Sequence, residues 1–422
     1  MDSRPRSAAR LDRHGLSRRL LALLSAIAVL GPGFAGQAAR RHPGISIPRG
    51  YRLVAVQELR DGVFHYELRG TSFAQSVQVA RIPRSAGLTV RPALSRGRIK
   101  GSIPRTSQTS AMCRSADCLI ATNADFYYVT GAPVGGLVIR REPIASSSLG
   151  GRPHLLIAPD RTMKIGRLRL DVEMVSRHPV RVETAVGPLV LEEHIEDEKV
   201  VTVIDGINVD RGKNDIVMYT PRMGKRTTTT GGGIELRLDR VGDSKLRLGE
   251  RATYKIAAAR SKDDSKIKPR SIVLSGRGDG ADVLARLWDE VERGAARAKV
   301  RISVSSPSSI VGAVGGNPRL VKDGAVVEQD ADSFSLSRHP RTMVGWNAKG
   351  DLLMVTVDGR SREARGSSLP EAALFMKRLG AVEALNLDGG GSATFVVRGR
   401  VRNRPSDGYE RRVADALLVL RP

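Results

Sequence analysis

The sequence predicts an α+β protein with mixed β-sheets, flanking helices and an inserted, mainly β segment. Short apolar runs of strand length, bounded by Gly, Pro, Asn and Asp, recur along most of the chain. Helical patterns are confined to three stretches, 106–116, 281–298 and 368–379. The 422 residues, of which 41% are hydrophobic, suffice for one large domain with insertions or for two or three domains.

The first 38 residues have the pattern of an export signal. Arg18 and Arg19 close a basic region, an apolar run extends from Leu20 to Leu30, and small residues follow to Ala38. The apolar run is short for a membrane span, so we expect a signal peptide, with a signal anchor as the alternative. The expected location is therefore secreted, cell-envelope or periplasmic.

The chain is strongly basic, with 69 Lys and Arg against 44 Asp and Glu and a formal net charge of +25. This charge alone would suit a nucleic-acid-binding protein. The arginines are scattered through every segment, however, and no basic run alternates with aromatic residues. We therefore expect no specific nucleic acid, and favour a glycan, a phosphate-bearing substrate or an anionic envelope surface as the partner. The sequence leaves the oligomeric state open.

The two cysteines of the chain, Cys113 and Cys118, lie close together in the sequence. In an exported protein this spacing favours a local disulfide, which would close a very small loop. The seven His residues show no ligand spacing, so the sequence contains no zinc-site pattern.

The segment 39–105 is predicted to be an N-terminal, β-rich region. Its four expected strands cover residues 51–59, 63–68, 76–82 and 88–92. After the helix over 106–116, a buried strand from Cys118 to Thr122 ends in the polar residues Asn123 and Asp125. A glycine-containing turn and a strand over 137–140 follow.

An insertion is expected at about residues 160–300. Apolar runs there are separated by turn pairs such as Asp205-Gly206 and Gly242-Asp243. The helix over 281–298 has one apolar face, which indicates packing rather than chemistry. Because the insertion is poor in polar motifs, we expect it to be dispensable for the chemistry, and we expect a linker over 303–310.

The last third of the chain is richest in polar motifs. A strand ends at Asp358, a helix over 368–379 begins with a Ser-x-x-Glu capping box, and a strand over 384–388 ends at Asp388. If the two strands are parallel, the crossover brings both aspartates to the same sheet edge. Ligands bind preferentially at such an edge.

Three consecutive glycines, Gly389 to Gly391, follow Asp388 before strand character resumes at Phe395. Glycine allows the backbone to approach a ligand closely, and successive N–H groups in such a turn favour anions. A simple tight turn is the alternative.

Polar side chains that suit acid–base chemistry, phosphate binding or sugar binding gather at these strand ends and turns. For each of them a hydrogen-bonded turn is the alternative. Neither a Gly-x-Ser-x-Gly motif nor a P-loop is present. The candidates are Asn123, Asp125, Arg341, Thr342, Asp358, Arg360, Asn386, Asp388, Ser392, Glu410 and Arg411.

Five motifs in this part of the chain carry a family resemblance. They are Gly315-Gly-Asn-Pro-Arg-Leu-Val, His339-Pro-Arg-Thr, Val357-Asp-Gly-Arg, Ala384-Leu-Asn-Leu-Asp-Gly-Gly-Gly-Ser, and Asn403-Arg-Pro-Ser-Asp with Glu410-Arg-Arg. From Val311 to Leu420 the sequence resembles the phosphodiester glycosidase family, which includes the lysosomal enzyme that removes N-acetylglucosamine from phosphodiester-capped mannose. A weaker similarity covers Asn123-Ala-Asp-Phe, where Ala124 and Asp125 replace two glycines of the family's pattern.

The resemblance implies a phosphodiester glycosidase domain over 106–422 that hydrolyses a sugar-1-phosphodiester in envelope or extracellular glycan. The alternative is a non-catalytic, glycan-binding envelope protein with the same fold. Asp388 is expected to be the nucleophile or base, Asp358 to be an orienting, metal-binding or acid group, and Glu410 to be a further catalytic carboxylate. The expected substrate-binding residues are Asn123, Asp125, Arg341, Thr342, Arg360, Asn386, Gly389, Gly390, Gly391, Ser392 and Arg411. A divalent cation, Ca²⁺ or Mg²⁺, would suit the carboxylates, and the ligands of such an ion are not predicted.

Overall fold

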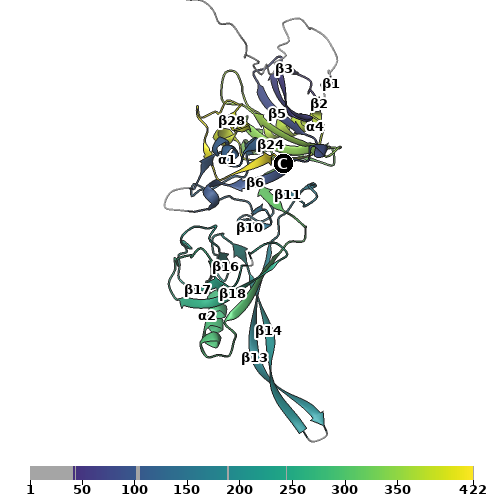
Figure 1. Cartoon of the computed structure of the whole chain (residues 1–422). Coiled ribbons are helices and arrows are strands. Elements are labelled where there is room, and N and C mark those ends of the chain that lie inside the picture. Colours follow the sequence, from purple (N-terminus) through teal and green to yellow (C-terminus); the bar gives the residue numbers. More distant parts are fainter. Residues whose placement is uncertain (1–40, 43, 101–104, 188–189, 244, 422) are drawn as a thin grey trace, which may run out of the picture.

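The computed structural model describes residues 41–42, 44–100, 105–187, 190–243 and 245–421, so the predicted export signal lies outside them. Strands predominate in these ranges, and the helices are few and short (Figure 1). The predicted α+β class is confirmed. None of the helices in the described ranges has the length and apolar character needed to span a bilayer.

The first large sheet combines strands from the two ends of the chain in the order β23-β22-β26-β24-β25-β5-β4-β3. Helix α4 (Leu369–Arg378) packs on this sheet through buried side chains such as Ala372 and Met376. The strands are β3 (Tyr51–Arg60), β4 (Val63–Gly70), β5 (Ser76–Ile82), β22 (Arg319–Lys322), β23 (Ala325–Val326), β24 (Arg341–Asn347), β25 (Leu352–Val357) and β26 (Ala381–Asn386).

The second sheet, in the order β28-β27-β8-β30-β6, also joins distant segments. It contains β6 (Thr89–Leu94), β8 (Cys118–Asn123), β27 (Phe395–Val397), β28 (Arg400–Val401) and β30 (Asp415–Leu420), and α1 (Thr109–Ser115) precedes β8. A third sheet, β10-β9-β21-β11-β12, lies beside it. Its strands are β9 (Leu137–Ile139), β10 (Glu142–Ala145), β11 (His154–Ile157), β12 (Met163–Gly166) and β21 (Gly312–Gly315). Minor elements are β1 (Arg41–His42), β2 (Ile45–Ser46), β7 (Ser107–Gln108), β29 (Arg412–Val413), α3 (Ser333–Leu336) and short 3₁₀ turns at Arg84–Ala86, Ser95–Gly97 and Gly390–Ser392.

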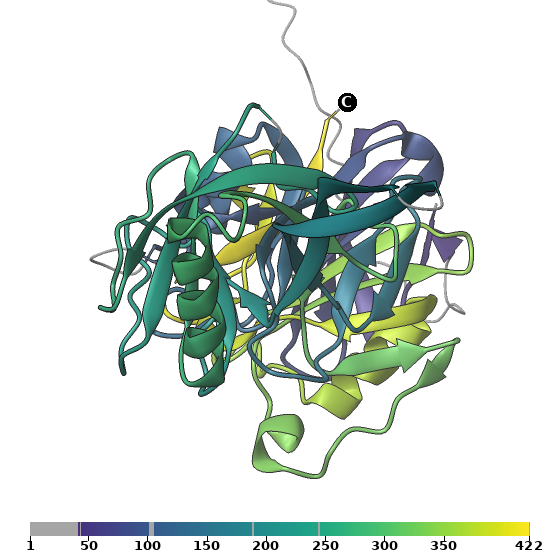
Figure 2. The same cartoon turned by 90° about the horizontal axis from the view of Figure 1, so that it is seen from below.

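The predicted insertion is an eight-stranded sheet with its own core, in the order β14-β13-β20-β18-β17-β19-β16-β15. Figure 1 shows it at the lower end of the molecule, with the β13–β14 hairpin projecting away, and Figure 2 shows it from below. Helix α2 (Asp279–Glu292) packs on it. The strands are β13 (Asp171–Gly187), β14 (Val190–Ile204), β15 (Gly206–Ile207), β16 (Ile216–Tyr219), β17 (Ile234–Arg240), β18 (Arg251–Arg260), β19 (Ser271–Gly276) and β20 (Lys299–Ser305).

The structure differs from two predictions made for residues 281–310. Helix α2 ends at Glu292 rather than at residue 298, because Gly294 adopts φ +74°, a left-handed conformation that does not continue a helix. The segment 303–310 was expected to be a linker, but β20 continues through Ser305 as a ladder partner of β13. The N-terminal β-rich region contributes β3–β5 to the first sheet and β6 to the second.

The predicted crossover is present, with one strand inserted between its two parallel strands. Strands β25 and β26 are both antiparallel to β24, so they run parallel to each other, and α4 connects them. The capping box at Ser368 and Glu371 is confirmed. Asp358 and Asp388 therefore follow strands at the same sheet edge, two strand spacings or about 10 Å apart.

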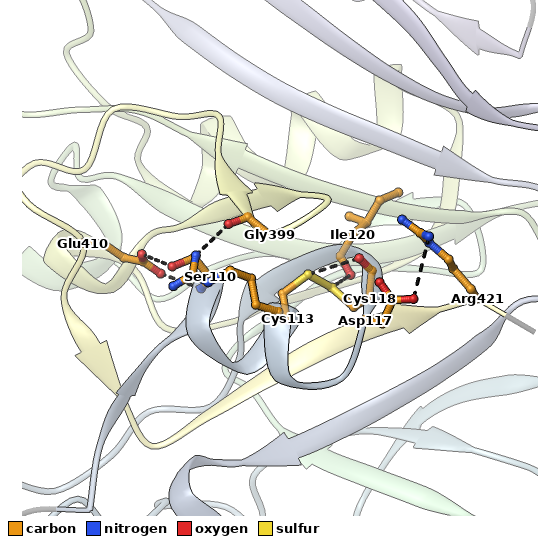
Figure 3. Close-up of a disulfide and its surroundings, with 9 residues drawn as sticks. Ser110, Cys113, Asp117, Cys118, Ile120, Gly399, Glu410 and Arg421 are labelled. Atoms are coloured by element: carbon orange, nitrogen blue, oxygen red, sulfur yellow. Dashed lines mark hydrogen bonds and ion pairs between the residues drawn. A yellow bond between two sulfur atoms is a disulfide. The ribbon is translucent and has the colours of Figure 1, made fainter.

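The predicted disulfide between Cys113 and Cys118 is confirmed, and it links the end of α1 to the start of β8 (Figure 3). We expect thiol titration of the denatured, unreduced protein to find no free thiol. Titration after reduction, which should find two, is the control. Two thiols before reduction would contradict the disulfide.

Candidate active site

A buried amide positions Asp388 at the edge shared by the first two sheets. The Asn123 side chain donates to the Asp388 carbonyl at 2.6 Å, and the Asp388 N–H donates to the Ala124 carbonyl at 2.8 Å. The Asn123 Oδ1 accepts from the Thr342 hydroxyl at 2.8 Å and from the Thr394 N–H at 3.1 Å. Asn123 and Thr342, both predicted to bind substrate, thus hold the loop that carries Asp388.

Two further aspartates lie behind Asp388 in the protein interior. Asp125 and Asp415 are 1% and 0% exposed, and the Asp125 N–H donates to Asp415 Oδ1 at 2.7 Å. The Asp125 carboxylate accepts from the Phe126 N–H at 2.8 Å and from the Gly135 N–H at 2.6 Å. Asp388 itself is only partly buried, so it is the member of the cluster that a substrate can reach.

The carboxylates of this cluster are all harder to ionise than an ordinary aspartate. Burial raises the pKa of Asp125 to about 7, against the opposing effects of the Gly135 N–H and the Arg152 charge. Burial raises the pKa of Asp388 to about 6, and the Ser392 hydroxyl, the Gly389 N–H and the Arg411 charge oppose it.

Burial, and after it the charge of Asp125, raise the pKa of Asp415 well above its ordinary value. Because the pKa values of Asp125 and Asp388 fall near neutral pH, the cluster exchanges protons there, which suits acid–base catalysis.

Two arginines supply positive charge next to the cluster. The Arg152 guanidinium lies 4.9 Å from the centre of the Phe126 ring, and its Nε and Nη2 are buried without a partner among the described residues. Arg411 is paired with Asp407 at 2.7 Å. Both charges lower the pKa of Asp388, so both guanidinium groups lie near its carboxylate, where they are suited to phosphate oxygens.

Several oxygens around Asp388 also lack hydrogen-bond partners within the described ranges. They are Asp415 Oδ2, Ser392 Oγ and Asn386 Oδ1, all of them buried. The Ser392 hydroxyl lies near enough to lower the pKa of both Asp388 and Tyr127, although it is not in hydrogen-bonding geometry with either. Buried polar groups without partners are rare, so these atoms are candidates for contact with a ligand or with water.

The glycine triplet forms a short 3₁₀ turn after Asp388. The Gly389 N–H donates to the Asp388 carboxylate at 2.9 Å, and the Gly390 N–H donates to the Pro340 carbonyl at 2.9 Å. These two amides are engaged within the protein, so Arg152, whose Nε and Nη2 have no partner among the described residues, is the better candidate donor for a bound anion. Gly390 has φ +57°, and a Cβ on Gly391 would collide with the Arg411 guanidinium, so both positions require glycine.

The other two predicted catalytic carboxylates are held by structural hydrogen bonds. Asp358 accepts from the Asn403 side chain at 3.1 Å and from the Arg404 N–H at 3.0 Å, and β24 separates it from Asp388. Glu410 accepts from the Ser110 N–H at 2.7 Å and from the Ser110 hydroxyl at 2.5 Å, in the first turn of α1 (Figure 3).

Three predicted substrate-binding residues bond to other parts of the protein. The buried Arg341 donates to the carbonyls of Ser367, Phe334 and Ser337 at 2.9–3.1 Å. Burial, followed by the charge of Arg360, lowers its pKa to about 10. Arg360 lies 3.3 Å from His339 Nδ1. Asn386 donates to the Asn317 carbonyl at 2.7 Å. Of these three, Arg360 lies beside Gly390 and closest to the glycine turn.

Residues 255–420 match the family model for phosphodiester glycosidases. The resemblance to the phosphodiester glycosidase family is confirmed. The matched segment begins in β18 and includes Asp388, Glu410 and Asp415, whereas Asp125 and Arg152 precede it.

Three known proteins are similar to this chain over short segments. The bovine N-acetylglucosamine-1-phosphodiester alpha-N-acetylglucosaminidase is 44% identical over 89 residues, which cover 19% of this chain and 17% of that protein. The human enzyme is 48% identical over 67 residues, covering 16% and 13%. A prophage-derived protein of Bacillus subtilis is 39% identical over 85 residues, covering 20% and 13%. The matches thus span one fifth or less of each relative.

Two solved structures share the fold over most of the chain. A protein from Synechocystis has a TM-score of 0.63 at 19% identity, covering 89% of this chain and 69% of that one. An exported-protein candidate from Burkholderia pseudomallei has a TM-score of 0.60 at 23% identity, covering 84% and 76%. At these identities the similarity concerns the fold alone.

Sequence reasoning did not identify three residues of the candidate site, Asp415, Arg152 and His154. Asp415 could have been found as the one charged residue of the apolar run Ala414–Leu420. Arg152 is one of many scattered arginines and has no local signature. His154 accepts from the Gly136 N–H at 2.8 Å, and burial lowers its pKa to about 4, so it supports the site as a neutral side chain.

The donor set at this site does not fit a bound metal ion. Within the described residues no group of three or more His, Cys, Asp or Glu side chains converges as metal ligands. Both Asp125 oxygens accept backbone N–H groups, whereas Ca²⁺ requires about six to eight oxygen ligands of its own.

Gly315 leaves space for the Asp125 carboxylate, and the variant Gly315→Ala tests whether the protein requires this space. A Cβ at Gly315 would lie 2.5–2.7 Å from the Asp125 carboxyl atoms. We expect a loss of stability of about 1–3 kcal/mol and a loss of activity of at least roughly tenfold, because the carboxylate must move.

Gly166→Ala is the matched control, since Gly166 and Gly315 pair with His154 from opposite sides and a Cβ on Gly166 meets only an ordinary contact at 3.5 Å. Thermal unfolding and turnover measure the two effects. Equal behaviour of the two variants would show that Asp125 does not need this space.

Proposed function

We propose that the chain is an exported phosphodiester glycosidase that hydrolyses the bond between a sugar's anomeric carbon and a phosphate oxygen in envelope or extracellular glycan. The observation that carries the proposal is the placement of the accessible Asp388 in front of the buried Asp125–Asp415 pair, with Arg152 and Arg411 beside it. The family match of residues 255–420 supports the same reaction class.

The free N–H groups of Arg152 are the best donors for the phosphate oxygens of the substrate, and Arg411 adds positive charge on the same side. They stabilise the charge that grows on the phosphate as the bond to the anomeric carbon breaks. Because a phosphate monoester is already a good leaving group, this departure requires little protonation.

Asp388 then acts on the sugar. Its carboxylate stabilises the positive charge that develops at the anomeric carbon, either as a nucleophile or as the base that removes a proton from water. The hydroxyl of the water ends on the anomeric carbon, and its proton passes to the aspartate cluster. Asp125 and Asp415 do not reach the substrate, and they act as positioning residues behind Asp388. The charge of Asp388 in turn contributes to the raised pKa of both.

Export is supported by the sequence pattern of the first 38 residues and by the disulfide, which forms in oxidising compartments.

The activity is tested with a sugar 1-(methyl phosphate) diester, by measuring free sugar and methyl phosphate together. Equimolar release of both products is the expected result. Saturable binding without release would support the non-catalytic, glycan-binding alternative. Release of methanol and sugar 1-phosphate would show cleavage on the wrong side of the phosphorus and would overturn the proposal.

A further inference from the structure

A second site for anions lies between the inserted sheet and the rest of the molecule. A pocket with a volume of about 650 Å³ is lined on one side by β6, β9 and β10 and on the other by β17, β18 and β19. None of the residues assigned above to the candidate active site lines this pocket.

The pocket carries a large excess of positive charge. Seven of its lining side chains are cationic and one, Glu142, is acidic. Glu142 is already occupied, because Arg222 donates to both of its oxygens at 2.7 and 2.6 Å. Arg270 is paired with Asp243 at 3.3 Å, so five of the seven cationic side chains have no acidic partner among the described residues.

Arg91, Arg140, Arg240 and Arg247 are the four lining arginines without an acidic partner in the described ranges. Arg91 and Arg140 form no ion pair in the part of the chain that the structure describes, and burial together with the Arg140 charge lowers the pKa of Arg91. The Nε of Arg240 is buried without a hydrogen-bond partner. Like charges held together destabilise a fold, so their retention in a formed pocket indicates an anionic ligand.

The rest of the lining is rigid and largely apolar. Pro92, Pro143, Pro221 and Pro269 contribute to it, together with Tyr254, which is 3% exposed. Such a lining with converging arginines suits an organic phosphate, because guanidinium groups bind phosphate oxygens in pairs while the organic part contacts the apolar surface.

Two pairs of strands connect this pocket to the aspartate cluster. Leu94 lines the pocket and pairs with Asp415, and Arg91 lies three residues further along β6, about 10 Å at roughly 3.3 Å per residue. Ile139 also lines the pocket and pairs with Gly312, while Gly315 at the other end of β21 lies against Asp125.

We propose that the substrate is a polymer of phosphodiester-linked units. One phosphodiester bond of this polymer is hydrolysed at Asp388, and the pocket binds another phosphate group of the same polymer molecule. The part of this inference that concerns the substrate rests on the proposed function. The inference that a phosphodiester polymer binds to the pocket does not rest on the proposed function, and it is tested separately.

The binding arm uses a glycerol phosphate oligomer, which contains phosphodiesters but no anomeric bond, and inorganic phosphate as the second probe. Calorimetric titration of Arg91→Gln/Arg140→Gln should show roughly tenfold weaker binding of the oligomer, with a salt dependence lower than that of the wild type. The control, Arg286→Gln/Lys377→Gln, removes the same charge from exposed helix positions and should bind as the wild type does.

Equal loss of affinity in the pocket and control variants would overturn the site, since only net charge would then matter. If inorganic phosphate bound as tightly as the oligomer, the inference that the ligand is a phosphodiester polymer would be wrong. The thermal midpoint of the pocket variant should not fall, because the substitution removes repulsion between Arg91 and Arg140.

The kinetic experiment measures kcat and KM for two substrates, a polymer of sugar-phosphate diesters and a molecule with a single sugar-phosphate diester. In the pocket variant we expect KM for the polymer to rise roughly tenfold with kcat unchanged, and both constants for the single diester to stay the same. Unchanged KM for the polymer would overturn the shared-substrate inference. Failure of the wild type to hydrolyse either substrate would instead overturn the proposed function, and the binding arm would still decide whether the pocket is an anion site.

Discussion

Replacing Asp388 with Asn is expected to lower turnover on the order of 10²-fold or more while the fold stays intact. Asn retains an Oδ1 that accepts from the Gly389 N–H, now at 2.9 Å, but it removes the charge and the proton affinity of the carboxylate. Sugar release and thermal midpoint should be measured on the same preparations, so that lost chemistry is separated from lost folding.

Asp358→Asn is the matched control. Asp358 lies at the same sheet edge, but β24 separates it from Asp388 and its oxygen accepts hydrogen bonds from Asn403 and Arg404. Because Asn keeps the accepting Oδ1 and burial raises the pKa of Asp358, we expect a smaller loss of turnover and no fall in the thermal midpoint at neutral pH. A stable Asp388→Asn protein with near wild-type turnover would remove Asp388 from the mechanism.

Asp415→Asn is expected to stabilise the protein above neutral pH and to weaken catalysis. Because the folded-state pKa of Asp415 is raised well above the unfolded value of about 3.9, the folded state keeps a proton that the unfolded state has lost. Wild-type stability therefore falls as pH rises through this window. Asn has no proton to lose, so the gain should be absent at pH 4 and reach roughly a few degrees in thermal midpoint at pH 8.

The same change should leave the pH dependence of the rate unchanged. Asp415 keeps its proton at the pH where Asp388 ionises, because its pKa is raised well above the ordinary value, so a neutral Asn does not alter the charge beside Asp388. A shift of the acid limb of the kcat/KM profile would show that Asp415 is ionised in the folded protein.

Asp351→Asn provides a control of opposite sign. Burial would by itself raise the pKa of Asp351, but the hydrogen bonds from Asn347, Arg84 and Arg81 outweigh it and lower the pKa. This variant should therefore lose stability at pH 8 and lose less at low pH. A uniform response of both variants across pH would contradict the assignment of Asp415 as a carboxyl with a raised pKa.

Local patterns in the sequence were sufficient to predict the strands β3, β4 and β5, the strand β8 and the helix α4. The run Ser76–Ile82 forms β5 with the predicted bounds, and the capping box at Ser368 sets the start of α4. These predictions succeed because side-chain periodicity and capping act over a few residues. The edge that carries Asp358 and Asp388 was also predictable, since a crossover helix between two strands makes them parallel.

The composition of the aspartate cluster could not be predicted in this way. Asp125 and Asp415 are 290 positions apart in the sequence, and their hydrogen bond exists only because β8 and β30 are neighbours in the second sheet. The roles of Arg341 and Glu410 likewise depend on which carbonyl and amide groups the tertiary fold places beside them. Residue type and local pattern identify chemical capacity, whereas partners come from strand order.

The strand order also determines how late in synthesis the molecule can finish folding. All eight strands of the inserted sheet are contiguous in sequence, from Asp171 to Ser305, so this unit has its partners as soon as that segment is complete. Strand β8, by contrast, pairs only with β27 and β30, near the C-terminus. Pairings of such high sequence separation form slowly. We therefore expect the inserted sheet to fold first, while the segments that build the aspartate cluster stay unpaired, and dependent on protection from aggregation, until the last strand has been made.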